Sequence, residues 1–234
     1  MEFFNSLIGE VSAFVDTSQK NIYPYTKDRL WTDEGYSQVI LQRDTAFELD
    51  GVGFNLVTSS DVGDGIVVIG DELDAITQSR KFARICLVQI EGNDDEQECY
   101  KLIKKADYIK YHFFPEGYMI RTTSRSHKES VRVAKSALKK GISFEKVGNL
   151  LISKYKENPK IKGVKVIFVT EKEADHKAFE AIAQKGYAIA ETLNHIMNSV
   201  KFDCDSCNLK PICDEVEGMK ELHFKSASMG EYNG

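Results

Sequence analysis

The sequence is poor in the features that mark membrane-spanning, secreted or linker-containing proteins. No stretch approaches the ~20 consecutive apolar residues that a membrane-spanning helix needs, so we expect no membrane segment. The N-terminus, MEFFNSLIGE, has an acidic residue where a signal peptide has its basic region, which predicts a cytoplasmic protein. There are only four prolines among 234 residues, and neither proline nor glycine gathers into a linker.

Two common signatures of catalysis and nucleotide binding are also missing. The sequence has no Walker loop and no GxGxxG motif, the glycine-rich loops that hold nucleotide phosphates. The histidines follow no spacing that indicates a Ser/His/Asp or Cys/His arrangement, so we name no catalytic residue. The formal net charge of −5 at pH 7 argues against a general nucleic-acid-binding protein.

The hydrophobic patterns that are present predict an α/β protein. Short apolar runs separated by glycine and aspartate predict strands within residues 36–90, among them SQVILQ, FNLVT, IVVIG and ARICLVQI. Further on, helices and strands alternate: we expect helices at 3–15, 99–113, 126–140, 143–158 and 170–185, a short one near 71, a last one around 189–200, and strands at 117–123 and 164–170. Ser143 is expected to cap one helix, and Thr170 with Glu173 to form the capping box of another.

These elements predict a mixed sheet with helices packed on it, arranged in two lobes. The first lobe is an N-terminal helix with a β-rich part, residues 1–95. The second is an α/β lobe, residues 96–201. A short irregular segment that contains cysteines, residues 202–234, follows.

Three of the five cysteines fall close together in the pattern Cys204-x2-Cys207-x5-Cys213-x9-His223. A CxxC pair brings two sulfurs within reach of one ion, and a third cysteine with a histidine completes the four ligands of tetrahedral zinc or of an iron–sulfur cluster. Acidic neighbours disfavour thiolates without a metal. The alternative is three ordinary cysteines in an acidic tail, and the case for His223 rests on its position alone.

The other two cysteines have a plainer interpretation. Cys86 lies in an apolar run and Cys99 on a helical pattern, so both are expected to be small buried side chains. An odd number of cysteines in a chain that looks intracellular argues against a disulfide framework.

Basic residues gather between positions 121 and 140. On the helix expected there, Lys128, Arg132, Lys135 and Lys139 would form one stripe. A solvated helix face is the simplest interpretation. The stripe could instead bind the phosphates of a nucleotide such as coenzyme A through Arg121, Arg125 and Arg132, or dock an acidic partner or the chain's own acidic tail.

Three stretches, taken in order, resemble one protein family. They are GFNLVTSSDVGDGIVVIGDELDAI at 53–76, GYMIRTTSRSHKESVRVAKSALKKGISFEKVG at 117–148 and VKVIFVTEKEADHKAF at 164–179. Together with the cysteine motif, they are similar to the β subunit of the carbon monoxide dehydrogenase/acetyl-CoA synthase complex. The resemblance covers roughly residues 28–213 and includes the family's middle domain and the start of its cluster-binding region.

The resemblance implies that Cys204, Cys207 and Cys213 bind a 4Fe–4S cluster, with zinc or nickel as alternatives. His223 stands where the family has a fourth cysteine, and the spacing between the second and third cysteines is shorter than in the family. The resemblance also implies a coenzyme A site, since Arg132 aligns with a basic position of the family's middle domain. Ser130 stands near the position of a family aromatic residue.

The family's Cys-Gly-Cys tripeptide, which chelates a second nickel, is absent from this sequence. We therefore expect an accessory protein of CO and one-carbon metabolism in an anaerobe, acting in electron transfer, metal delivery or assembly. Its expected partners are components of the same complex or a redox partner, and synthase chemistry would need a partner chain. The alternatives are a zinc-stabilised binding module without redox chemistry and a remnant without metal; homo-oligomers stay open.

Overall fold

The computed structural model describes residues 2–92, 96–123, 127–198, 207, 209–216, 218, 219, 221 and 222. The strands of this part are β1 (Lys20–Pro24), β2 (Thr45–Thr58), β3 (Gly65–Ile69), β4 (Arg80–Ile90), β5 (Tyr118–Thr122), β6 (Lys128–Ala134) and β7 (Ile161–Val169). The helices are α1 (Asn5–Thr17), α2 (Glu96–Tyr108), α3 (Lys135–Lys139), α4 (Phe144–Lys156), α5 (His176–Met197) and α6 (Lys210–Glu215), with 3-10 turns η1 (Gln42–Asp44) and η2 (Ile109–His112).

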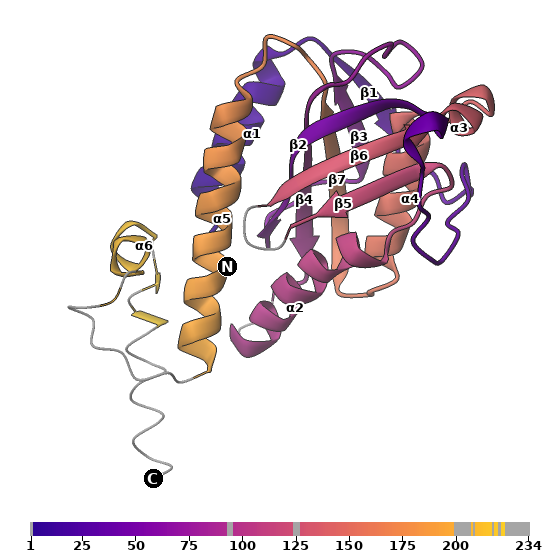
Figure 1. Ribbon diagram of the computed structural model, residues 1–234. Coiled ribbons are helices and arrows are strands. Elements are labelled where there is room, and N and C mark those ends of the chain that lie inside the picture. The colour runs from indigo at the N-terminus through magenta and orange to yellow at the C-terminus, as the bar shows by residue number, and fades with distance from the viewer. Residues whose placement is uncertain are drawn as a thin grey trace.

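The strands form one mixed sheet in the order β1-β3-β7-β4-β2-β6-β5 (Figure 1). β2 runs parallel to β4, and β3 runs parallel to β7; the other neighbours are antiparallel. This confirms the predicted α/β class with a mixed sheet. Strands from both expected lobes alternate in the same sheet, since β7 lies between β3 and β4. The division into two lobes stays a prediction.

Helices α4 and α5 cover opposite faces of this sheet. Gly148 of α4 lies against Phe168 of β7, and Gly186 of α5 lies against Leu56 of β2. The register of the strands places Phe168 on the same face as Gly53. Because side chains alternate along a strand, Leu56 points to the other face. Both faces of the central strands are therefore buried.

Several predicted elements are confirmed. The helix expected at 3–15 is α1, and the runs FNLVT, IVVIG and ARICLVQI lie in β2, β3 and β4. Ser143 caps α4, where its hydroxyl oxygen accepts a hydrogen bond from the backbone N–H of Lys146 at 3.2 Å. Cys86 in β4 and Cys99 in α2 are both buried.

The helix predicted at 126–140 is wrong in its first half, because residues 128–134 form strand β6. Glu129, Val131 and Val133 are buried on one face, while Lys128 and Arg132 lie on the other. Pairing with β2 and β5 decides the conformation here. The basic residues consequently do not share a helix face, since the last two of the expected stripe belong to α3.

Four further predictions of local structure are also wrong. Helix α5 is capped by Asp175, whose carboxylate accepts from the N–H groups of Lys177 and Ala178, and not by a box at Thr170. The hydroxyl of Thr170 instead donates to the carbonyl oxygen of Asp71 at 2.7 Å. The two last helices are one continuous α5, residues 73–75 are a turn where a short helix was expected, and residues 37–41 form no strand.

None of the described helices is long and apolar enough to span a membrane.

Candidate functional site

The described part of the cysteine segment contains Cys207 and Cys213, both partly buried. The carbonyl oxygen of Cys207 accepts from the N–H of Lys210 at 3.2 Å, and the N–H of Cys213 donates to the carbonyl of Leu209 at 3.3 Å. The two cysteines thus lie at a turn and on the short helix α6 that follows it. Cys204 and His223 lie outside the described residues.

The cysteine segment is anchored to the domain through α5, beside which α6 lies (Figure 1). Lys185 of α5 forms an ion pair of 3.0 Å with Glu215 of α6. Met219 and Leu222, which follow α6, are buried. The two described cysteines are therefore held near the surface of α5.

The donor chemistry at this place fits a soft metal, because two thiols lie on one short turn and helix. Within the part of the chain that the structure describes, no group of three or more His, Cys, Asp or Glu side chains could hold a metal ion. A complete ligand set would need Cys204 and His223 as well, so that set stays a prediction.

Two of the three predicted phosphate-binding arginines are described. Arg121 is exposed on β5 and pairs in register with Ser130, which places it on the same face as Arg132 of β6. The guanidinium of Arg132 donates to the Glu48 carboxylate at 2.6 Å and to the carbonyl of Ile40 at 3.3 Å. Part of its donor set is thus already used. Arg125 lies outside the described residues, and coenzyme A binding stays a prediction.

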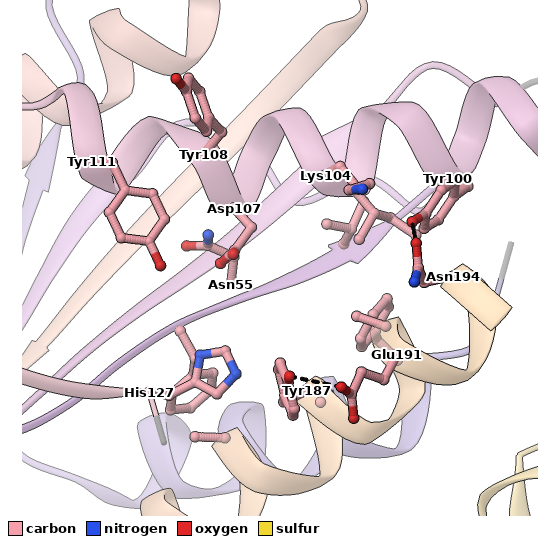
Figure 2. Close-up of a pocket in the computed structure, with 17 residues that line it drawn as sticks. Asn55, Tyr100, Lys104, Asp107, Tyr108, Tyr111, His127, Tyr187, Glu191 and Asn194 are labelled. Carbon is pink, nitrogen blue, oxygen red and sulfur yellow. Dashed lines mark hydrogen bonds between the residues drawn. The ribbon is translucent and has the colours of Figure 1, made fainter. Parts of the chain in front are cut away.

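A cavity of about 380 Å³, which none of the sequence motifs predicts, lies between α2, α5 and β2. Figure 2 shows side chains from both helices pointing into it. Most of its surface is apolar, and several of its walls are aromatic rings. Its lining residues with a chemical role below are Asn55, Tyr100, Lys104, Asp107, His127, Tyr187 and Glu191.

The cavity lies where strands β6 and β2 diverge. The two strands pair only as far as Val52, and beyond that point α2 packs beside β2. The side-chain N–H of Asn55 donates to the carbonyl of Ala106 in α2 at 3.2 Å. Helix α5 crosses the face of β2 and packs against α2, which closes the far wall.

His127 lines the cavity and has an unusual backbone conformation and a ring without hydrogen-bond partners in the described part of the chain. Its backbone has φ of +48°, in the left-handed region, and its carbonyl accepts from the N–H of Gly53 at 2.9 Å. The residue is 8% exposed, and its ring packs edge-to-face with Tyr187, with 5.2 Å between the ring centroids. Neither ring nitrogen has a hydrogen-bond partner among the described residues. Burial, followed by the charge of Lys110, lowers the pKa of His127, which favours the neutral ring.

The charged groups around the cavity are largely paired with neighbours. Asp107 forms an ion pair of 2.7 Å with Lys110, and Glu191 accepts a hydrogen bond of 2.8 Å from the hydroxyl of Tyr187. The ammonium of Lys104 lies over the ring of Tyr100, 5.4 Å from its centroid. The cavity therefore presents aromatic faces with few uncompensated charges.

A buried polar network adjoins the cavity through Asn55. The side-chain oxygen of Asn55 accepts from the hydroxyl of Tyr155 at 2.8 Å. Cys86 lies beside this hydroxyl and accepts from Arg84 at 3.1 Å. Burial raises the pKa of the Cys86 thiol, so it stays protonated and is a poor nucleophile. This matches its expected structural role.

Comparisons with known proteins relate the chain to one family. The chain matches the family described as the CO dehydrogenase/acetyl-CoA synthase complex beta subunit over residues 27–174. It is also 30% identical over 149 residues to the carbon monoxide dehydrogenase/acetyl-CoA synthase subunit alpha of Moorella thermoacetica. This match covers 62% of the chain and 19% of the relative. The family match ends before α5 and the cysteine segment.

Proposed function

Because the chain belongs to the CO dehydrogenase/acetyl-CoA synthase complex beta subunit family, we propose that it is an accessory protein of CO and one-carbon metabolism. In this proposal it is cytoplasmic and holds an iron–sulfur cluster or a metal in its C-terminal cysteine segment. The observation that supports this most is the anchoring of the segment on α5, since it holds Cys207 and Cys213 in a fixed part of the chain.

The proposed ligands are Cys204, Cys207 and Cys213, with His223 as the fourth. Asp214 and Glu215 are exposed next to Cys213, and their charges disfavour thiolate anions without a cation between the sulfurs. A bound 4Fe–4S cluster would supply one-electron transfer. The chain's own residues would bind the group and tie it to α5.

The accessory role follows from the ligands that these 234 residues lack. There is no Cys-Gly-Cys tripeptide to chelate a second nickel. We therefore propose that this chain takes part in synthase chemistry only together with a partner. That partner would be a subunit of a CO dehydrogenase/acetyl-CoA synthase complex, and it would supply the nickel ligands. The chain spans about a fifth of the Moorella relative, so that protein's activity enters here only as a proposal.

Coenzyme A is a second element of the proposal. Arg121 and Arg132 point to the same face of the β5–β6 pair, where they could contact phosphate groups together. Arg125 comes from the segment between these strands in sequence. Arg121→Ala is expected to weaken coenzyme A binding several-fold in calorimetry, and absence of binding by the parent protein would end this element.

A zinc-stabilised binding module without redox chemistry is the alternative function. The specific observation in its favour is the aromatic cavity, which offers a ligand site that needs no electron transfer. In that case zinc would only tie the cysteine segment to α5. The two functions differ in colour, because iron–sulfur clusters absorb visible light and zinc thiolates do not.

Spectroscopy of protein purified without oxygen separates these functions. We expect a brown protein whose visible absorbance bleaches on reduction, and which loses this absorbance in Cys207→Ser and Cys213→Ser. Cys99→Ser is the matched control, because Cys99 is buried in α2 and is expected to leave the spectrum unchanged. A colourless parent protein, or a spectrum that survives both substitutions, would overturn the proposal.

A further inference from the structure

We propose that the cavity between α2 and α5 binds a flat, uncharged nitrogen heterocycle that has no phosphate group. The site is formed by β2, α2, His127 and α5, and uses none of the cysteines. The inference goes beyond the proposed metal-binding function and does not depend on it.

The shape and lining of the cavity favour a flat ligand. Its volume of about 380 Å³ lies within the usual range for small-molecule sites. The rings of Phe4, Phe54, Tyr100, Tyr111 and Tyr187 are among its walls. Aromatic walls favour a planar, polarisable ligand, because ring faces and edges pack well against one another and against bases.

The unsatisfied ring of His127 indicates what the ligand edge must offer. A neutral imidazole has one N–H donor and one acceptor nitrogen, and both lack a protein partner among the described residues. Such buried groups are rarely left unpaired in native proteins. The two nitrogens point in different directions, so one ligand edge reaches one of them. A nitrogen heterocycle with a ring nitrogen and an adjacent amino group presents an acceptor and a donor on one edge, and so can pair with that nitrogen in either tautomer.

The backbone of His127 supports a functional role for this ring. A histidine with φ of +48° is in a sparsely populated conformation that the surrounding structure must enforce. The bond from the Gly53 N–H to the carbonyl of His127 holds it in place. Figure 2 shows that the ring then points into the cavity, toward Asn55 and Asp107.

The charges at the cavity argue against a phosphate group in the ligand. Asp107 and Glu191 contribute two carboxylates, and Lys104 contributes one ammonium group to the lining. Lys110 neutralises Asp107 from outside the lining. The two carboxylates balance the two ammonium groups, so the cavity offers a phosphate no net positive charge, whereas an uncharged ring needs none.

Calorimetric titration of the full chain with adenosine and with adenosine monophosphate tests the proposal. We expect adenosine to bind with one-to-one saturation and the monophosphate to bind at least about tenfold more weakly. His127→Phe keeps an aromatic ring but removes both nitrogens, and should weaken adenosine binding by about tenfold. The matched control is His112→Phe on the exposed side of η2, which should leave adenosine binding unchanged.

A second variant covers the case in which His127→Phe does not fold. Ala190→Trp adds bulk to the cavity from a partly exposed position of α5, and should abolish adenosine binding while the protein stays folded. Failure of the parent protein to bind adenosine, equal or tighter binding of the monophosphate, or undiminished binding in both variants would overturn the inference. Cys207→Ser should bind adenosine like the parent. The adenosine result therefore tests the cavity independently of the proposed metal site.

Discussion

Arg84 of β4 and Glu129 of β6 form a buried ion pair that spans the strand between them, β2. Two hydrogen bonds, of 2.8 and 2.7 Å, join the guanidinium to the carboxylate. The pair can cross β2 because Gly53 has no side chain. A Cβ atom at this position would lie only 1.9 Å from the carboxylate oxygen Oε2 of Glu129. Burial alone would lower the pKa of Arg84, but Glu129, with smaller contributions from Cys86 and Tyr155, raises it above its ordinary value, so the guanidinium stays charged.

Substitution of Gly53 by alanine should strongly destabilise the fold. The added methyl group overlaps the Glu129 carboxylate and must displace the ion pair, which we expect to lower the free energy of unfolding by about 3 kcal/mol or more. Urea denaturation measures the change. Gly9→Ala is the control, since nothing lies within 4 Å of a Cβ there, and the exposed helix position should gain about 0.5–1 kcal/mol. Equal effects at both glycines would contradict this role for Gly53.

Arg84 and Glu129 should stabilise the fold as a pair, so that removing both charges costs less unfolding free energy than removing one. Arg84→Met leaves the Glu129 carboxylate buried without its partner, which we expect to cost about 3–5 kcal/mol of unfolding free energy. The double variant Arg84→Met/Glu129→Leu removes both charges and should regain most of that loss. Urea denaturation of the parent, both single variants and the double variant gives the coupling energy. Additive losses would show that the ion pair does not act as a unit.

Acid should weaken the link that Glu98 makes between α2 and the residues before β7. Hydrogen bonds from Lys101 and Lys160 hold the pKa of Glu98 at about 2, below its ordinary value of 4.5. A lowered pKa in the folded state stabilises the fold above pH ~4.5, and this contribution is lost as the pH falls toward ~2. Glu98→Gln should therefore differ from the parent in urea midpoint near neutral pH but not near pH 2. The difference should be small and shrink in high salt, because the side chain is partly exposed.

His127 should make the fold less stable at mildly acidic pH. Burial and Lys110 lower its pKa below the ordinary value of 6.5, so the unfolded chain takes up a proton that the folded chain does not. The stability that depends on the neutral ring is present above pH ~6.5 and is lost as the pH falls below it. Melting temperatures between pH 8 and about 5.5 should fall less in His127→Phe than in the parent.

The hydrophobic patterns predict strands in β2, β3, β4, β5 and β7, but they do not predict β1 and they place a helix where β6 lies. Val131, Ala134 and Leu138 fit a helical period, yet residues 128–134 also alternate between buried and exposed positions as a strand does. Only pairing with β2 and β5, which come from elsewhere in the chain, decides between the two. The start of α5 was misplaced for a related reason, since the hydroxyl of Thr170 is taken by the carbonyl of Asp71.

The candidate sites differ in how visible they are in the sequence. The cysteine segment is a local spacing, so it can be found without a structure. The cavity joins residues far apart in the chain, as the hydrogen bond from Tyr100 to Asn194 shows. One signal was available: Tyr100, Lys104, Asp107 and Tyr111 are spaced to share one side of the helical arm that α2 and η2 form. The unsatisfied state of His127 could not be read from its neighbours in sequence.

Metal and sulfide content of protein purified without oxygen tests the proposed function most directly. We expect about four irons and four acid-labile sulfides per chain, lost in Cys207→Ser and retained in Cys99→Ser. Nickel in addition would link the chain to synthase chemistry with a partner. One zinc per chain and no sulfide would contradict a redox role and favour the zinc-stabilised binding module.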